Sequence, residues 1–337
     1  MKGFSLLRIS LVALWAVLVT APASATFPGK NGRIAFVQDG EIFTMNPDGT
    51  DIRQITHVGP DTAANWPAWS ANGRAIVFNE TPPGGVAELW IMNADGSKPH
   101  LLLSEPNFAE NRPSFSPDGS RVVFGRCDLL IGDGDTCAIY TVASNGTDLR
   151  PVTQFLRDTT ARSPMYSPDG RTLAFILSND SAAGFLGVTY LIEADGSNQR
   201  RVTDPAPCLI RPDWSPDGTR ITLFAHLCNP ENEKIAVMDA DGSDVRYLTD
   251  NGKDFYHGPH DRNPAFSPDG QFIVFERNPP DLSSSALYVM RANGSELRSV
   301  LVLPRPQSSS QRSNHRRNRL TKIEEGGSVP RWGVAPE

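Results

Sequence analysis

The sequence predicts an all-β fold built from six repeated four-stranded antiparallel sheets, on three observations. A turn motif, Pro-x-aromatic-Ser-Pro-Asp-Gly, recurs along the chain. A second turn motif, Asn/Asp-x-Asp-Gly or a close variant, lies between its copies. The glycines of the second motif are 46 to 52 residues apart, which is the spacing of the blades of a β-propeller.

The first motif predicts a tight turn between two strands. Full copies occupy residues 113–119, 164–170, 212–218 and 264–270. A less exact copy occupies residues 67–73. A run rich in β-branched and aromatic residues follows each copy, as a strand requires. These runs occupy residues 75–78, 121–124, 172–175, 221–224 and 272–275.

The second motif predicts another tight turn, later in each repeat. Its glycines are Gly49, Gly96, Gly146, Gly196, Gly242 and Gly294. Asn or Asp suits the third position of a type I turn, and Gly supplies the positive φ that follows. Such turns join antiparallel neighbours, so each repeat contains four strands, two tight turns and one variable loop.

The two ends of the chain complement each other. The first repeat begins at residues 32–36 and lacks the leading strand of the other repeats. Residues 329–333, Val-Pro-Arg-Trp-Gly, are a spare copy of that strand. Pairing this C-terminal strand into the first blade would close the ring and remove an exposed sheet edge. We therefore expect a six-bladed β-propeller.

The repeated Ser-Pro-Asp-Gly and Asn-Ala-Asp-Gly turns resemble those of the WD-repeat-like β-propellers of the TolB family, over about residues 27–337. TolB itself has an additional α/β domain before its propeller, so we expect a relative rather than TolB itself. Similar propellers also accompany peptidase domains and form an oligogalacturonate lyase family. The resemblance therefore implies a fold and leaves the function open.

Residues 1–25 have the pattern of a secretory signal peptide. Lys2 and Arg8 precede or open an apolar run that ends at Val19, and an Ala-Ser-Ala sequence follows at residues 23–25. The run is short for a membrane span, although an uncleaved anchor is the alternative. Cleavage after Ala25 would leave residues 26–337 as an exported chain, periplasmic or secreted, with no transmembrane span.

The four cysteines are expected to form two disulfides, because disulfides persist in exported proteins. Cys127 and Cys137 flank one variable loop, and Cys208 and Cys228 flank one pair of strands. Four cysteines allow three pairings, of which we favour Cys127–Cys137 and Cys208–Cys228. Free thiols in a reducing compartment are the alternative.

The functional site is expected around the mouth of the central channel, on the face that carries the variable loops. Residues just before the motif prolines should lie there, and many of them are arginines, which bind carboxylates. The candidate ligand-binding residues are Trp66, Arg112, Arg126, Arg162, Arg211, Arg262 and Arg277. The alternative is that these arginines form salt bridges between blades, with Glu80, Glu110, Asp261 and Glu276.

Histidines provide a second candidate site. His257 and His260 lie in the connection that enters the last repeat, and His226 lies in a variable loop of the preceding repeat. Neutral imidazoles bind Zn, Ni, Cu or Fe, so the three together would make a divalent metal site at the channel mouth. The alternative is three solvated histidines and no cofactor.

Charge restricts the kind of partner. The net charge of −6 and the isoelectric point of about 5.6 argue against specific nucleic-acid binding. A basic insertion at residues 304–322 carries six Lys or Arg and no acid. Its composition predicts a disordered, solvated segment, and contact with an anionic surface is the alternative.

We expect a monomeric, non-enzymatic binding scaffold that recognises a protein segment or an acidic ligand at the loop face. The partner would be an envelope or extracellular protein or an acidic small ligand. The alternative, implied by the resemblance to the lyases, is a metal-dependent enzyme acting on acidic sugars. A third hypothesis places the contacts on the rim of the propeller. The sequence contains no Gly-x-Ser-x-Gly, His-Glu-x-x-His or Gly-x-x-x-x-Gly-Lys motif.

Overall fold

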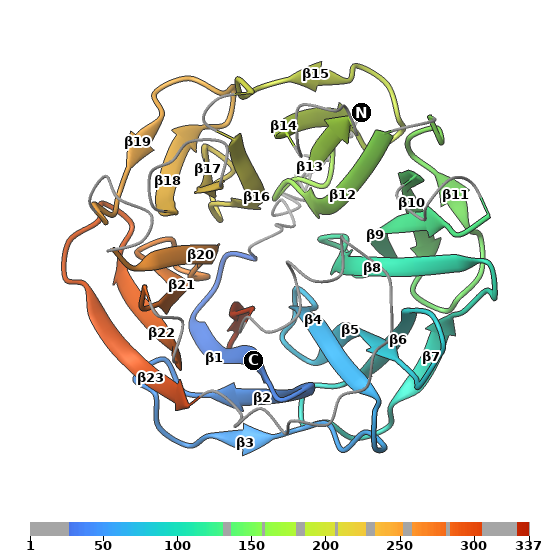
Figure 1. The fold of residues 1–337 in the computed structure, drawn as a ribbon, viewed down its shortest axis with the longest axis horizontal. Helices are drawn as coiled ribbons and strands as arrows, with labels where there is room; N and C mark the ends of the chain where they lie inside the picture. The colour runs from blue at the N-terminus through green and yellow to red at the C-terminus, as the bar shows by residue number, and fades with distance from the viewer. Residues whose placement is uncertain are drawn as a thin grey trace, which may run out of the picture.

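The computed structural model describes residues 27–130, 136–156, 159–179, 186–205, 208–226, 233–251, 258–280, 284–304 and 329–336. Their strands form a ring of sheets around a central axis (Figure 1). The expected signal peptide (1–25), Cys228, His257 and residues 305–322 of the basic insertion lie outside the described residues. No helix in the described part of the chain is long and apolar enough to cross a membrane.

Four sheets are separate four-stranded antiparallel blades. The first blade contains β24 (Arg331–Val334), β1 (Asn31–Gln38), β2 (Glu41–Met45) and β3 (Arg53–Gln54), in that order. The second contains β4 (Ala63–Trp69), β5 (Ala75–Thr81), β6 (Glu88–Asn93) and β7 (His100–Leu103). The third contains β16 (Cys208–Trp214), β17 (Arg220–His226), β18 (Lys234–Asp239) and β19 (Arg246–Tyr247). The fourth contains β20 (His260–Phe266), β21 (Phe272–Asn278), β22 (Ser284–Arg291) and β23 (Arg298–Pro304).

The remaining strands form one eight-stranded sheet, which corrects the expectation of six separate sheets. One half contains β8 (Phe108–Phe115), β9 (Arg121–Asp128), β10 (Thr136–Ala143) and β11 (Arg150–Pro151). The other contains β12 (Thr159–Tyr166), β13 (Thr172–Asn179), β14 (Leu186–Glu193) and β15 (Arg200–Arg201). Each half is antiparallel, as predicted for a blade. They are joined because β10 and β12 approach closely enough for one parallel pairing, Cys137 with Thr160.

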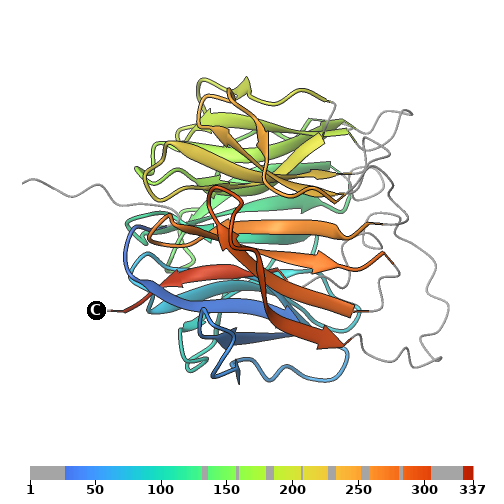
Figure 2. The same ribbon diagram turned by 90° about the vertical axis from the view of Figure 1, so that its left-hand side faces the viewer.

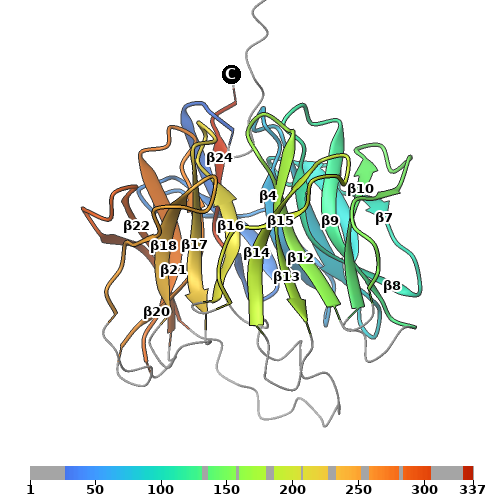
Figure 3. The ribbon, with the colours of Figure 1, turned by 90° about the horizontal axis from the view of Figure 1, so that it is seen from above.

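The tight turns form where the motifs predict them. At residues 116–119, the Gly119 amide donates to the carbonyl oxygen of Ser116 at 2.8 Å, and Gly119 has φ of 69°. The Ser116 hydroxyl donates to Asp118 at 2.6 Å and accepts from the Arg121 amide at 2.9 Å. These turns lie on one face of the ring, at the top of Figure 3, and the β5–β6 loop lies on the opposite face (Figures 2 and 3).

The second strand of every repeat buries a phenylalanine between neighbouring sheets. These residues are Phe36, Phe78, Phe124, Phe175, Phe224 and Phe275, and none is more than 2% exposed. Burying one such side chain contributes about 1.5–3 kcal/mol. The core is therefore distributed around the ring rather than concentrated in one place.

A glycine–carbonyl contact links each repeat to the one before it. A Cβ added to the glycine of the second turn motif would lie 2.1–3.1 Å from a carbonyl oxygen of the preceding repeat. The six pairs are Gly49–Val300, Gly96–Ile55, Gly146–Leu102, Gly196–Val152, Gly242–Val202 and Gly294–Leu248. These glycines also have φ between 81° and 98°, so both the turn and the close approach require glycine.

Replacing Gly96 by Ala is expected to destabilise the protein more than replacing Gly119 by Ala. Both positions have positive φ, 86° and 69°, so alanine strains both backbones. Only at Gly96 would the methyl group also meet the Ile55 carbonyl oxygen, 2.3 Å away, whereas Gly119 has no atom within 4 Å. Urea unfolding should therefore give Gly96→Ala an additional loss of about 1–3 kcal/mol. Equal losses at the two positions would contradict the importance of the close approach.

The C-terminal strand closes the ring as predicted. β24 pairs antiparallel with β1, with Trp332 opposite Ile34 and Arg331 opposite Ala35. It also packs against the second blade, where the Trp69 indole donates to the Arg331 carbonyl oxygen at 3.3 Å. Gly333 lies against the Trp69 ring so closely that an added Cβ would be 2.5 Å from a ring atom.

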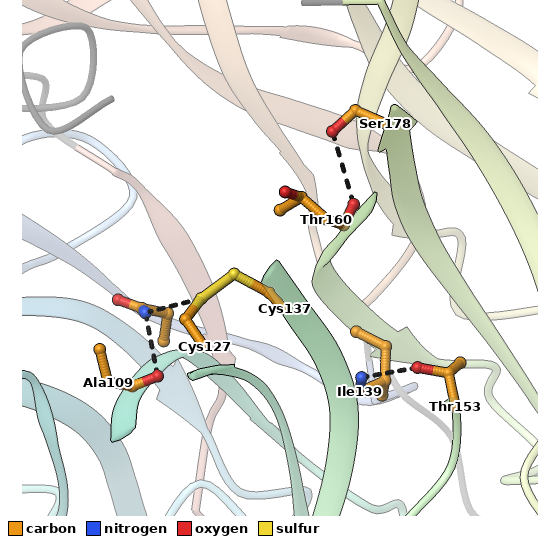
Figure 4. The surroundings of a disulfide bond; sticks show 8 residues. Ala109, Cys127, Cys137, Ile139, Thr153, Thr160 and Ser178 are labelled. Atoms are coloured by element: carbon orange, nitrogen blue, oxygen red, sulfur yellow. Dashed lines mark hydrogen bonds between the residues drawn. A yellow bond between two sulfur atoms is a disulfide. The ribbon is translucent and has the colours of Figure 1, made fainter. Parts of the chain in front are cut away.

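The Cys127–Cys137 disulfide predicted from the sequence is present (Figure 4). The two cysteines are direct cross-strand partners on β9 and β10, at the base of a variable loop. The Asn111 side chain donates to Cys127 Sγ at 3.8 Å. Cys208 is also in a disulfide, and its predicted partner, Cys228, lies outside the described residues.

Replacing both Cys127 and Cys137 by Ala is expected to lower the free energy of unfolding by about 2–3 kcal/mol. The crosslink joins residues separated by 10 positions, and a loop of that length removes about this much entropy from the unfolded chain. Urea unfolding under oxidising conditions checks the value. An unchanged midpoint would show that β9 and β10 hold this loop without the crosslink.

Candidate functional site

Each inner strand has a bulge directly before its motif proline. Register shifts interrupt the pairing of β4, β8, β12, β16 and β20 with their neighbours at this point. The residue there has φ between 52° and 57° in all five strands: Trp66, Arg112, Ser163, Arg211 and Asn263. Bulges redirect side chains, and a positive φ at a bulky residue costs about 1–3 kcal/mol. The ring maintains this strain at five equivalent positions around its axis.

The bulged residues surround a narrow cavity at the axis. Trp66, Arg112, Ser163 and Arg211 line it, together with the prolines that follow them, Met165 and Arg331. Its volume is about 20 Å³, little more than one water molecule needs. Among the described residues, the lining contains three arginines and no acidic residue.

The Trp66 ring makes cation–π contacts with two of these arginines. The Arg112 guanidinium lies 4.5 Å from the centre of the Trp66 ring, and the Arg211 guanidinium lies 4.6 Å from it. Both distances are within the range of cation–π attraction. Sequence reasoning selected all three residues, and the structure brings them together in one cavity.

Each of the two arginines also reaches the next inner strand around the ring. Arg112 Nη1 donates to the Ser163 hydroxyl at 2.7 Å, and Arg211 Nη1 donates to Asn263 Oδ1 at 2.6 Å. The acceptors are neutral, so these hydrogen bonds orient the guanidiniums without neutralising them.

Arg331, on the closing strand, is the third arginine of the cavity and was not among the predicted site residues. Its Nη1 lies 3.7 Å from Asp213 Oδ1. Burial lowers the pKa of Arg331, Asp213 opposes this effect, and the neighbouring Arg112 adds to it. The sequence did contain a signal, because Arg331 follows Pro330 in the spare copy of the inner strand.

Arg126 lies away from the cavity, in an ion-pair cluster on the β8–β11 half-sheet. Its guanidinium is 2.5 Å from Glu105 and 3.3 Å from Glu110, and it lies 3.8 Å from the centre of the Phe108 ring. Arg126 is 3% exposed, so it is held in the sheet rather than presented to a ligand. This arrangement fits the salt-bridge alternative, although Arg126 and Glu110 belong to adjacent strands of one sheet.

The other predicted arginines do not line the cavity either. Within the β20–β23 blade, Arg277 donates two hydrogen bonds to the Asp261 carboxylate, at 2.6 and 2.7 Å. Arg262 pairs with Glu233 of the preceding blade. Arg162 and Arg262 each precede the bulged residue by one position, and alternate residues of a strand point to opposite sides. The bulged residue Ser163 lines the cavity, whereas Arg162 and Arg262 do not.

The histidine site is described only in part. His260 is buried, and its Nδ1 lies 3.6 Å from Glu233 Oε2. The His226 side chain and all of His257 lie outside the described residues. Among the described residues, no three His, Cys, Asp or Glu side chains are grouped so that they could hold a metal ion. The metal site therefore stays a prediction.

Glu110 makes stability depend on pH. Its burial outweighs the attraction of Arg126 and raises its pKa from 4.5 to about 8. The unfolded chain releases this proton near pH 4.5, whereas the folded protein keeps it until about pH 8. The contribution of Glu110 to the free energy of unfolding is therefore complete below pH 4.5. It is lost as the pH rises toward about 8.

Glu110→Gln is expected to remove this dependence. The free energy of unfolding of the wild-type protein, relative to that of the variant, should fall by on the order of several kcal/mol between these two pH values. Urea unfolding at a series of pH values measures it, with Glu296→Gln, at an exposed ion pair, as the control. Parallel pH profiles for Glu110→Gln and the wild type would contradict the assignment.

The ring of blades and its arginine-lined axis define a β-propeller with a small axial cavity. Residues 102–310 match the family model described as the TolB beta propeller domain. Because this match covers more than half of the chain, the protein belongs to the TolB β-propeller domain family.

Two curated relatives match about half of the chain. It is 26% identical over 201 residues to the uncharacterized peptidase YuxL of Bacillus subtilis (strain 168), a match that covers 49% of this chain and 29% of that protein. It is 29% identical over 179 residues to the Tol-Pal system protein TolB of Anaeromyxobacter dehalogenans (strain 2CP-C). This match covers 50% of this chain and 36% of that protein. The matched region thus spans about a third of the length of these relatives.

Solved structures share the fold. TolB from Acinetobacter baumannii superposes with a TM-score of 0.65 at 22% identity, covering 90% of this chain and 67% of that one. An oligogalacturonate lyase in complex with manganese superposes with a TM-score of 0.53 at 13% identity. The superposition covers 82% of this chain and 75% of that one. At these identities the likeness concerns the fold alone.

Proposed function

We propose that this protein is an exported, non-enzymatic propeller that binds an acidic group of a partner protein or of a small ligand at its central channel. One observation carries the proposal: Arg112, Arg211 and Arg331 converge on the axis, and no acidic residue of the described part of the chain lines the cavity. Guanidiniums recognise carboxylates by charge and by paired hydrogen bonds. The side-chain oxygens of Ser163 and Asn263 accept hydrogen bonds from Arg112 and Arg211 and so orient the two guanidiniums.

We also infer that the blades number six, with the eight-stranded sheet counting as two. Two observations support this count. Each half of that sheet has its own inner strand, β8 or β12, and each half has its own glycine contact with the preceding repeat. Six inner strands would then surround the channel, with β24 supplying the sixth.

Export is part of the proposal and rests on two features. Residues 1–25 have the signal-peptide pattern described above, and the Cys127–Cys137 disulfide suits an oxidising compartment. In such a compartment, the loop face would meet envelope or extracellular partners.

The proposal is tested by affinity capture from envelope and culture-fluid extracts with residues 26–337 as bait. The double variant Arg112→Gln/Arg211→Gln should lose the partner that the wild-type bait captures. The matched control, Arg53→Gln/Arg150→Gln, removes the same charge from exposed arginines of the outer strands and should retain it. Circular dichroism and thermal unfolding confirm that each bait is folded.

Two results would count against the proposal. A partner retained by both variants would move the contact from the channel to other parts of the surface. Stoichiometric metal after purification, together with activity on uronates, would replace the scaffold by the alternative of a metal-dependent enzyme on acidic sugars.

A further inference from the structure

A groove lies between the β12–β15 half-sheet and the β16–β19 blade, on the face of the ring that carries the tight turns. The turns at residues 167–169 and 216–218 line it, as do Asp241 of a second-motif turn and Pro28 near the start of the described chain. Its volume is about 730 Å³, whereas that of the axial cavity is about 20 Å³. None of its described lining residues belongs to the axial cavity, so the groove is a separate site.

Buried apolar side chains form the base of this groove. Leu191, Ile192 and Trp214 line it and are each 2–3% exposed. The Trp214 indole donates to the Met165 carbonyl oxygen at 3.3 Å, which fixes the ring in place. The prolines of the two neighbouring turns add apolar surface at the sides. A ligand that enters the groove therefore meets an apolar surface, and covering such a surface favours binding.

Acidic side chains stand around this base: Asp169, Glu193, Asp217 and Asp241. Hydrogen bonds from Ser243 lower the pKa of Asp241. At Asp169 and Asp217, burial raises the pKa, but hydrogen bonds within each turn outweigh this effect and the net shift is downward. The three aspartates are therefore ionised at neutral pH.

The described lining holds fewer cations than acids. Arg200 is its one cation, and its Nη1 donates to the Asp241 backbone carbonyl oxygen at 3.3 Å. Arg171 and Arg220 lie close enough to lower the pKa of two of the aspartates, but neither belongs to the lining. Four acids and one arginine give this part of the surface a negative charge, which favours a cationic ligand.

The tight turns do not require this charge. The four equivalent positions between the β4–β7 blade and the β8–β11 half-sheet are Asn72, Asn93, Asp118 and Asn145. Asparagine closes the same turn, because Asn72 Oδ1 accepts from the Arg74 amide at 3.0 Å, as Asp217 Oδ1 does from the Thr219 amide at 3.0 Å. Turn formation therefore does not explain why four acids meet at this groove.

Two segments of this chain do not suit the groove. β23 begins after the Gly294 turn and therefore ends at the loop face, so the basic insertion starts on the opposite side of the ring. In the mature chain expected after cleavage at Ala25, only Thr26 precedes the buried Phe27, and one residue is too short to fill the groove. The occupant is therefore a separate molecule.

We propose that this groove is a docking site for an extended segment of a partner protein in which arginine or lysine alternates with apolar residues. The cationic side chains pair with the carboxylates, and the apolar ones cover the base formed by Leu191, Ile192 and Trp214. The groove shares no residue with the axial cavity, so this inference goes beyond the proposed function and does not depend on it.

The experiment measures by fluorescence anisotropy how a labelled six-residue peptide of alternating leucine and arginine binds to residues 26–337. Saturable binding is expected. It should weaken as the ionic strength rises, and the same peptide with citrulline in place of arginine should not bind. Asp217→Asn/Asp241→Asn should weaken the affinity about fivefold or more, because two ion pairs are lost. The matched control, Asp95→Asn/Asp118→Asn, makes the same changes at equivalent turns outside the groove and should bind like the wild type.

A second measurement does not depend on these variants. A photoreactive form of the peptide should label the wild-type protein within residues 167–169, 191–200 or 214–218, as located by peptide mapping. No saturable binding, equal weakening by the two double variants, or labelling confined to other segments would overturn the docking site.

Two controls separate this inference from its neighbours. Sedimentation at low salt tests a second copy of the chain as the occupant: self-association that Asp217→Asn/Asp241→Asn abolishes would overturn the assignment to a partner protein. Arg112→Gln/Arg211→Gln should still bind the peptide, so failure of the channel proposal would leave the groove in place. Loss of peptide binding in that variant, once shown to be folded, would contradict the separation of the two sites.

Discussion

The contact on which the rest of the structure depends is a glycine methylene lying against a carbonyl oxygen of the neighbouring repeat. It occurs six times around the ring, each time at a turn whose φ only glycine adopts easily. Neighbouring repeats can therefore approach more closely than any side chain would permit, and the phenylalanines between them are enclosed. The approach is mutual, so no repeat has a complete environment unless both of its neighbours are in place.

This closed ring explains how strain and like charge can coexist at the axis. Five inner strands carry a residue in the left-handed region at the same height, and two of those residues are arginines stacked on one indole. In a flexible chain, both the backbone strain and the repulsion would be released by movement. Here the surrounding sheets over-determine the positions of the bulges, so the arginines keep their places around a small cavity.

Much of the fold could be predicted because turn residues act locally in the sequence. The features that were missed depend on contacts between distant parts of the chain. Turn residues such as Asp118 and Gly119 act within a few positions, so strand order and ring closure were predictable. Arg162 and Arg262 do not line the axial cavity, whereas the bulged residue Ser163 does, and no single residue type indicates a bulge in the sequence. Arg331 enters the cavity only because the chain ends meet in space. The parallel pairing that joins β10 to β12 likewise depends on how closely two repeats approach.

The pairing of β24 with β1 has a consequence for how the chain reaches its final form. β24 follows all the other described strands in the chain, so β1 can gain this partner only after those strands have been synthesised. Until then, the nascent protein is an open arc with one incomplete sheet at its leading end. The pairing of β24 with β1 therefore closes the ring only after the intervening strands are present.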